Sequence, residues 1–210
     1  YSLEMGGAEV LVAQLCRIQR ANGHDVSLCA YSKLGPIGET LQAEGFSIFV
    51  PGEAHPSFTM FRYLRHFLRL RPDVVHCHNH APTLQAALPG RLSGARCVLS
   101  TRHSLVDPPY DYTYELMFSI ISRFCNYVVV ICDITCENLR HIPWAAKKKV
   151  VRVYNGTNPI LRVDSSPLDS DSATQSGEPT FTLLYIGRLA TVKTLDILVR
   201  AVAIAAEKLP

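Results

Sequence analysis

Apolar positions along the chain switch repeatedly between a helical spacing and short unbroken runs. The short runs predict strands over residues 25–31, 46–50, 73–76, 96–101, 127–131 and 150–154. The helical spacing predicts helices over residues 7–22, 37–44, 57–70, 110–124 and 133–141, and one that follows the third strand until Pro89 and Gly90 interrupt it. Ser57 is the predicted N-cap of the third helix.

This alternation predicts an α/β fold. Strands that alternate with helices form βαβ units, whose strands are parallel and whose sheet is covered by helices on both faces. We expect one such domain over residues 1–160 and a Ser-, Asp- and Pro-rich linker over residues 161–180. The apolar run 181–186 and the helical spacing from Leu195 then predict one strand and one helix of a second domain, within residues 181–210.

Composition narrows the class of protein. Of the 210 residues, 48% are hydrophobic and 19% are charged, which is typical of a globular protein. The net charge of +3 is too small to indicate nucleic-acid binding. The seven cysteines form no CxxC pair and lie in apolar segments, which favours reduced, buried thiols in a cytosolic protein.

The stretch from Gly187 to Thr194 predicts a phosphate site. A glycine turn follows the predicted strand, and Arg188 and Lys193 flank the loop before the next helix. A helix N-terminus attracts anions, and two cations strengthen that attraction. Val192 stands where a nucleotide-triphosphatase loop of the GxxxxGK[ST] type needs its second glycine, so we exclude that class.

Gly6 and Gly7 open the first predicted helix, where a backbone without side chains allows a ligand to approach closely. An ordinary turn before a helix is the competing interpretation. The dinucleotide signature GxGxxG is absent from the chain, which argues against a nicotinamide or flavin enzyme.

Histidines follow two predicted strands. His76, His78 and His80 alternate at the end of one strand, but the chain is expected to turn at Asn79, so we favour a polar pocket lining over a metal site. His103 follows the next strand, where an imidazole could act as acid, base or hydrogen-bond partner, or could be structural.

Arg62, Arg65 and Arg69 form a stripe at helical spacing, opposite a predicted apolar face of Phe58, Phe61, Leu64 and Leu68. Such a stripe could contact an anionic membrane surface or an acceptor. Most stripes of this kind are only solvated, and we favour that interpretation from the sequence.

Together these motifs resemble the retaining glycosyltransferases of family 4, which have the GT-B fold. The resemblance rests on five motifs in order: Gly6-Gly-Ala-Glu9, Asp73-Val-Val-His-Cys-His78, Ser100-Thr-Arg-His103, Val153-Tyr-Asn-Gly-Thr-Asn158, and Gly187-Arg188 with Lys193. It implies two Rossmann-like domains that face each other across a cleft, the first holding the acceptor and the second a nucleotide-sugar donor.

The resemblance also implies roles for particular residues. Arg188 and Lys193 match the cations that bind the donor diphosphate, and Gly7 matches the glycine that approaches the reaction centre. His103 matches a histidine that contacts the transferred sugar, which makes it our candidate catalytic residue. The remaining motif residues are expected to line the acceptor side of the cleft: Gly6, Glu9, His78 and Asn155. No cofactor and no bound metal are expected.

The expected function is therefore transfer of a sugar from a nucleotide sugar to a sugar, lipid or polyol acceptor, with retention of configuration. The family's first strand would precede Gly6, and its carboxylate motif and base pocket would follow Pro210, so we expect a piece of a longer enzyme that is inactive alone. A nucleotide-sugar epimerase and a non-catalytic carbohydrate- or partner-binding module stay as alternatives. The donor sugar, the acceptor and peripheral contact with the inner face of a membrane stay open.

Overall fold

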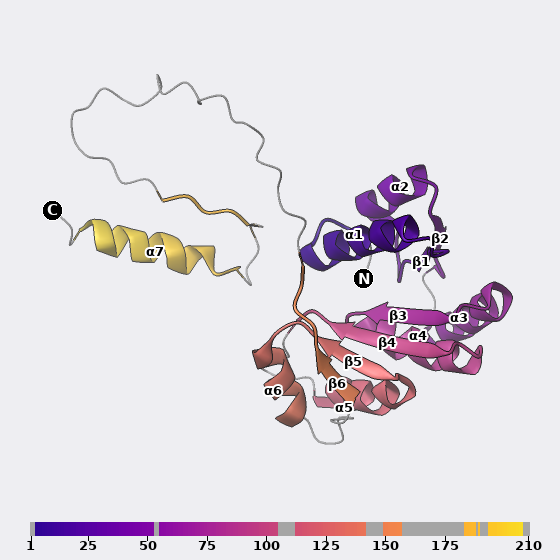
Figure 1. The fold of residues 1–210 in the computed structure, drawn as a ribbon. Coiled ribbons are helices and arrows are strands. Elements are labelled where there is room, and N and C mark those ends of the chain that lie inside the picture. The colour runs from indigo at the N-terminus through magenta and orange to yellow at the C-terminus, as the bar shows by residue number, and fades with distance from the viewer. Residues whose placement is uncertain are drawn as a thin grey trace. The chain divides into compact units, whose positions relative to one another are not determined.

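The computed structural model describes residues 3–52, 55–104, 112–141, 149–156, 183–187, 189 and 193–207. Its contacts divide the chain into two compact units, Tyr1–Pro159 and Ile160–Pro210. Helices and strands alternate through the first unit, as the sequence predicts (Figure 1): α1 Gly7–Ala21, β1 Ser27–Cys29, α2 Gly35–Ala43, β2 Ser47–Phe49, α3 Pro56–Leu70, β3 Val74–His78, α4 His80–Leu92, β4 Cys97–Arg102, α5 Tyr112–Ile121, the 3-10 turn η1 Ser122–Phe124, β5 Tyr127–Val130, α6 Asp133–His141 and β6 Val150–Arg152.

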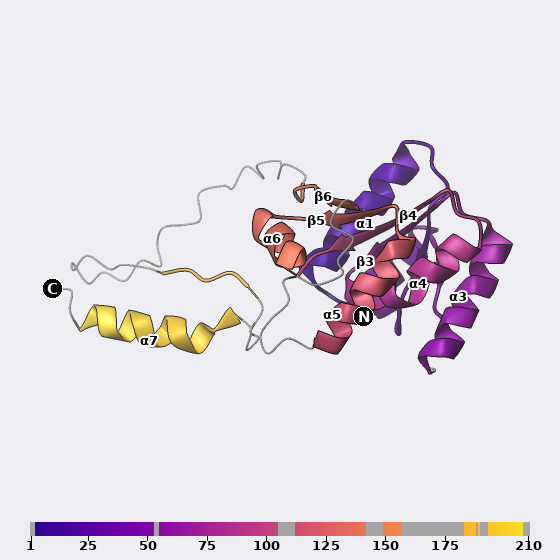
Figure 2. The same ribbon diagram turned by 90° about the horizontal axis from the view of Figure 1, so that it is seen from below.

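Every strand pair is parallel, which confirms the predicted α/β class. The strands form two sheets, one with the order β1-β2 and one with the order β3-β4-β5-β6. Helices flank these sheets, and the view from below in Figure 2 shows α3, α4 and α5 next to one another. Because the strands are parallel, the carboxyl ends of β3, β4, β5 and β6 all lie at one edge of the larger sheet.

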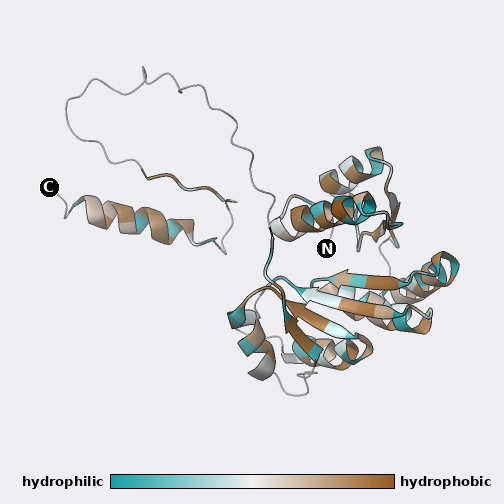
Figure 3. Cartoon of the chain, viewed as in Figure 1, coloured by the Kyte–Doolittle hydropathy of each residue, from teal (hydrophilic) through white to brown (hydrophobic). Residues whose placement is uncertain are grey.

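Three groups of buried apolar side chains hold the first unit together. A helix on a sheet buries one apolar stripe, and on α3 that stripe differs from the predicted one: Tyr63 and Phe67 are buried, whereas Phe58, Phe61 and Leu68 are exposed. One group joins α1, α2 and β1, the second joins α3 and α4 to β3 and β4, and the third joins α5 and α6 to β5. Figure 3 shows the hydrophobic residues that run along the strands of the larger sheet.

Two local predictions are wrong. The N-cap of α3 is His55 rather than Ser57, and the His55 ring shares a hydrogen bond of 2.7 Å with the Ser57 hydroxyl. Pro56 at the first position of the helix explains the earlier start, because a proline there lacks only a donor that has no partner in the helix.

Helix α4 also continues through Pro89 and Gly90 instead of ending there. Packing against β3 outweighs the local preference: a Cβ on Gly90 would come within 3.1 Å of the Val75 side chain, so the helix lies very close to the strand. Ala87 on the same helix is fully buried. A helix that fits this closely keeps its course despite one missing hydrogen bond.

In the second unit, the predicted helix is present as α7, Leu195–Ala206. The strand predicted over residues 181–186 is not formed at residues 183–186, which pair with no other described segment. A strand needs a partner for its backbone groups, and the described part of this unit contains no second extended segment. Residues 161–180, the predicted linker, lie outside the described residues.

Within the described part of the chain, no helix is both long enough and apolar enough to cross a membrane.

Candidate functional site

Three histidine rings lie together at the carboxyl ends of β3 and β4. The ring centroids of His76 and His78 are 4.0 Å apart, and those of His78 and His103 are 5.4 Å apart. His78 Nδ1 and His103 Nε2 share a hydrogen bond of 3.1 Å, and His76 Nε2 lies 2.7 Å from the Thr101 hydroxyl. The parallel register produces this cluster, because it pairs His78 with Thr101 and brings the two strand ends side by side.

Burial keeps these imidazoles neutral. Desolvation and the neighbouring His103 lower the pKa of His76 to about 4. Desolvation, with His76 and His103 nearby, lowers the pKa of His78 to about 2. Burial also lowers the pKa of His103, against the opposing negative charge of Glu9. At neutral pH the cluster therefore offers hydrogen-bond donors and acceptors rather than positive charge.

The two ring nitrogens of His103 differ in their hydrogen bonds. Its Nε2 is bonded to His78, whereas its Nδ1 is buried and has no hydrogen-bond partner among the described residues. A buried nitrogen without a partner costs free energy unless a ligand or water satisfies it. If His78 donates in the shared bond, His103 Nδ1 is a donor, and if His103 donates, Nδ1 is an acceptor; either tautomer suits a hydroxyl.

The N-terminus of α1 contributes Gly6, Gly7 and Glu9. A Cβ on Gly6 would lie 2.2 Å from Glu9 Oε2, so the carboxylate folds back over the start of the helix. A Cβ on Gly7 would meet no described atom within 4 Å, so packing against the described residues does not require glycine there. The effect of Glu9 on the pKa of His103 links this helix end electrostatically to the histidine cluster.

Asn79, which the sequence analysis marked only as a turn, has a strained backbone. Its φ of 69° and ψ of 176° lie in a region that side-chain-bearing residues rarely adopt. The turn separates His80 from His76 and His78, as expected. The His80 ring packs on Tyr114 and Phe118 of α5, at centroid distances of 4.0 and 4.8 Å. Backbone strain of this kind is often found at functional sites.

A buried ion pair supports the loop that carries His103. Arg102 donates two hydrogen bonds to the carboxylate of Glu115 on α5, at 2.7 and 2.6 Å, and a third to the backbone oxygen of Ser104. Arg102 and Glu115 are only 4% and 7% exposed. The sequence analysis did not identify this pair, because nothing in the spacing of residues 102 and 115 indicates a contact.

The remaining predicted site residues are Asn155, Lys193 and Arg188. Asn155 is exposed and follows β6, at the same edge of the sheet. Lys193 is exposed in the second unit, next to Thr194, the N-cap of α7. Arg188 lies outside the described residues. Thr194 has a φ of 49°, a left-handed conformation that costs a β-branched residue energy.

No group of three or more His, Cys, Asp and Glu side chains converges as metal ligands among the described residues. His76, His78 and His103 are bonded to each other or to Thr101 instead. The arrangement suits recognition of hydroxyl groups.

Comparison with known proteins identifies the family. The model of Glycosyltransferase Family 4 matches residues 5–160. No curated protein sequence matches the chain significantly.

Several solved structures share the fold. Anabaena Alr3699/HepE in complex with UDP has a TM-score of 0.62 at 12% identity, over 75% of this chain and 44% of that chain. MurG of Acinetobacter baumannii has a TM-score of 0.53 at 17% identity, over 75% and 45%. The UDP-GlcNAc 2-epimerase from Methanocaldococcus jannaschii has a TM-score of 0.54 at 14% identity, over 73% and 44%. The chain thus spans less than half the length of each, and at these identities the likeness shows the fold alone.

We predict that Arg102→Met lowers the free energy of unfolding by about 3–5 kcal/mol, because it removes both short hydrogen bonds to the buried Glu115 carboxylate and leaves only His80 Nε2 at 3.7 Å. The double variant Arg102→Met/Glu115→Leu should recover most of that loss. Urea denaturation of the three proteins measures both effects. As the matched control, Arg96→Met removes an exposed pair with Asp73 (side chains 85% and 77% exposed) and should cost less than about 1 kcal/mol. Equal losses in Arg102→Met and Arg96→Met would contradict the assigned role.

We also predict that the free energy of unfolding decreases as the pH falls from 6.5 to about 4. Above pH 6.5, His76 is neutral in both states and its contribution is complete; below it, the unfolded chain binds a proton that the folded chain does not, since the folded pKa is about 4. His78 extends this loss to lower pH. Denaturation curves at several pH values should show a flatter dependence in His76→Asn/His78→Asn, whereas exposed His24→Asn should match the parent. An unchanged slope in the double variant would refute the prediction.

Proposed function

The chain belongs to glycosyltransferase family 4, and from that premise we propose that it forms the acceptor side of an enzyme that transfers a sugar from a nucleotide-sugar donor. The acceptor is a sugar, a lipid or a polyol, and the anomeric configuration is retained. UDP and UDP-glucose complexes of the structural relative Alr3699/HepE support a nucleotide-sugar donor. Because the chain covers less than half of such relatives, the proposal concerns a protein of their length that carries this chain.

The observation that carries this proposal is the histidine cluster at the carboxyl ends of β3 and β4. Ligands of parallel α/β sheets bind outside the carboxyl ends of the strands. There, His103 has a buried Nδ1 without a described partner, held in place through its bond to His78. A neutral imidazole in this place can bond to a hydroxyl of the transferred sugar.

In the proposed reaction, the acceptor oxygen forms a bond to the anomeric carbon while the bond from that carbon to the donor phosphate breaks. The leaving nucleoside diphosphate carries the electron pair, and one of its phosphate oxygens takes up the proton that the acceptor hydroxyl gives up. Arg188 and Lys193 would stabilise the charge on the leaving diphosphate, without a bound metal. Gly7 would leave space for the reacting groups, since no described atom lies within 4 Å of the position that a Cβ would take there. Gly6, Glu9, His78 and Asn155 would line the acceptor side.

Epimerisation of a nucleotide sugar is the second candidate, because the UDP-GlcNAc 2-epimerase shares the fold. Product analysis separates the two. A transferase releases a nucleoside diphosphate and joins the sugar to an acceptor or to water. An epimerase returns an intact nucleotide sugar. A non-catalytic binding module would catalyse neither sugar transfer nor epimerisation, and Arg188→Ala would then leave both rates unchanged.

We predict that Gly7→Ala and His103→Ala each lower kcat/KM for sugar transfer by about 10²–10³-fold in the protein of the relatives' length, as is typical when one stabilising contact to the reacting groups is lost. Gly7→Ala should leave the melting temperature unchanged or slightly raised, because its Cβ enters open space. Release of nucleoside diphosphate from a panel of nucleotide sugars measures the rate.

His24→Ala, at an exposed position far along the sequence from both residues, serves as the control and should keep the parent rate. Parent-like transfer by Gly7→Ala would exclude a close approach of the reacting groups at that residue. We further propose that the 210-residue chain alone transfers little or no sugar; transfer by it at the rate of the longer protein would overturn that part of the proposal.

A further inference from the structure

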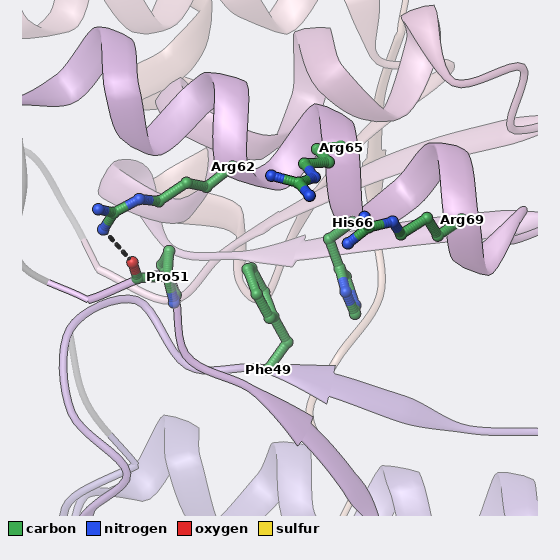
Figure 4. Close-up of a pocket in the computed structure, with 6 residues that line it drawn as sticks. All are labelled: Phe49, Pro51, Arg62, Arg65, His66 and Arg69. Atoms are coloured by element: carbon green, nitrogen blue, oxygen red, sulfur yellow. Dashed lines mark hydrogen bonds between the residues drawn. The ribbon is translucent and has the colours of Figure 1, made fainter.

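A cavity of about 360 Å³ lies between α3 and the turn that follows β2. Its lining combines cationic and apolar side chains, which Figure 4 shows in place: Phe49, Pro51, Arg62, Arg65, His66 and Arg69. In that view the three arginines follow one another along α3, with Phe49 and Pro51 across from them. The His66 ring stacks on Phe49 at a centroid distance of 4.1 Å and an interplanar angle of 6°, and the two stacked rings form part of the cavity lining.

Among the described residues, little compensates the positive charge of this cavity. Arg62 donates a hydrogen bond to the backbone oxygen of Pro51. Neither Arg65 nor Arg69 has an ion pair or hydrogen bond within the described part of the chain, and α3 contains no acidic residue. Guanidinium groups gathered around a concave site bind phosphate well, because each offers two parallel N–H donors to one anion.

Apolar side chains surround this charge on the outward face of α3. Thr59, Tyr63 and Phe67 are buried and define the inward face of the helix. On the other side Phe58, Phe61 and Leu68 are 65%, 61% and 52% exposed. At helical spacing Phe61 and Leu68 lie beside Arg65, and Phe58 lies beside Arg62, so exposed rings and arginines share one surface.

This combination differs from an ordinary solvated helix. Such helices expose a polar face that carries charges of both signs. An outward face with large apolar side chains, arginines and no carboxylate is typical of helices that lie in the interface of an anionic membrane. The structure therefore changes the interpretation favoured from the sequence, in which the arginine stripe was merely solvated.

We propose that α3 binds to an anionic membrane surface, with the phosphate group of one lipid held in the cavity of Arg62, Arg65 and Arg69. Phe58, Phe61 and Leu68 enter the boundary between headgroups and acyl chains. The negative surface potential of the membrane attracts the arginines, and the apolar side chains leave water. This surface is independent of the histidine cluster and of the proposed sugar transfer.

Co-sedimentation with lipid vesicles tests the proposal. The protein should bind vesicles made of equal parts phosphatidylcholine and phosphatidylglycerol, and should not bind vesicles of phosphatidylcholine alone. Arg65→Gln/Arg69→Gln should lower the partition coefficient by about 30-fold, from the attraction that each arginine contributes. Phe58→Ser/Phe61→Ser should lower binding as well, and all four changed positions are exposed, so folding is preserved.

Two controls distinguish a specific phosphate site from attraction of the membrane by net positive charge. Arg91→Gln removes an exposed arginine at the end of α4, outside the cavity, and should keep most of the binding. Arg65→Lys/Arg69→Lys keeps the charge but loses the paired donors, and should bind more weakly than the parent and more tightly than the Gln variant.

Four results would overturn the proposal. One is an absence of binding to the anionic vesicles, and another is parent-like binding by Arg65→Gln/Arg69→Gln. A third is an equal loss in Arg91→Gln, which would show attraction by net charge alone. The last is binding of soluble glycerol phosphate at the cavity without binding to vesicles, which would assign the site to a free phosphorylated ligand.

Discussion

The ion pair between Arg102 and Glu115 fixes the end of β4 against α5. Both groups are buried, and the carboxylate accepts two hydrogen bonds from the guanidinium. Arg102 also binds the backbone of Ser104, so the segment that carries His103 is held from both sides. A loop without such support would let His103 swing away from His78. The position of the candidate catalytic imidazole thus depends on a charge pair whose side chains are not part of the histidine cluster.

The parallel sheet supplies the second constraint. Its register pairs His78 with Thr101, and the His76 ring shares a hydrogen bond with the Thr101 hydroxyl. The chain then turns sharply at the strained Asn79. Burial at this edge depresses the pKa values of the histidines, so the cluster is neutral where an isolated histidine would be partly charged. Neutral imidazoles fixed by one another can exchange hydrogen bonds with hydroxyl groups without attracting phosphate.

Much of the fold was predictable from the sequence. Hydrophobic spacing predicted each strand and helix of the first unit, because burial of one face controls both patterns. It failed where tertiary contacts outweigh local preference: α4 runs through Pro89 because it packs closely on β3, and residues 183–186 form no strand without a partner.

The candidate site was partly predictable for the same reason. The positions of His78 and His103 at strand ends follow from the βα rhythm, and the structure joins them by a hydrogen bond. The Arg102–Glu115 pair and the cavity on α3 could not be predicted, because each depends on which elements lie side by side. Arg188 and Lys193 keep the roles that the family resemblance implies, and these roles stay predictions.

The edge of the sheet around His103 is proposed to bind a nucleotide sugar. Proton–nitrogen NMR spectra of the histidine side chains test it most directly, during titration of a protein of the relatives' length with UDP-glucose. The account predicts that the Nδ1 resonance of His103 shifts as the nitrogen gains a partner, while exposed His24 stays unchanged. A saturating titration that leaves the His103 resonances in place would contradict it.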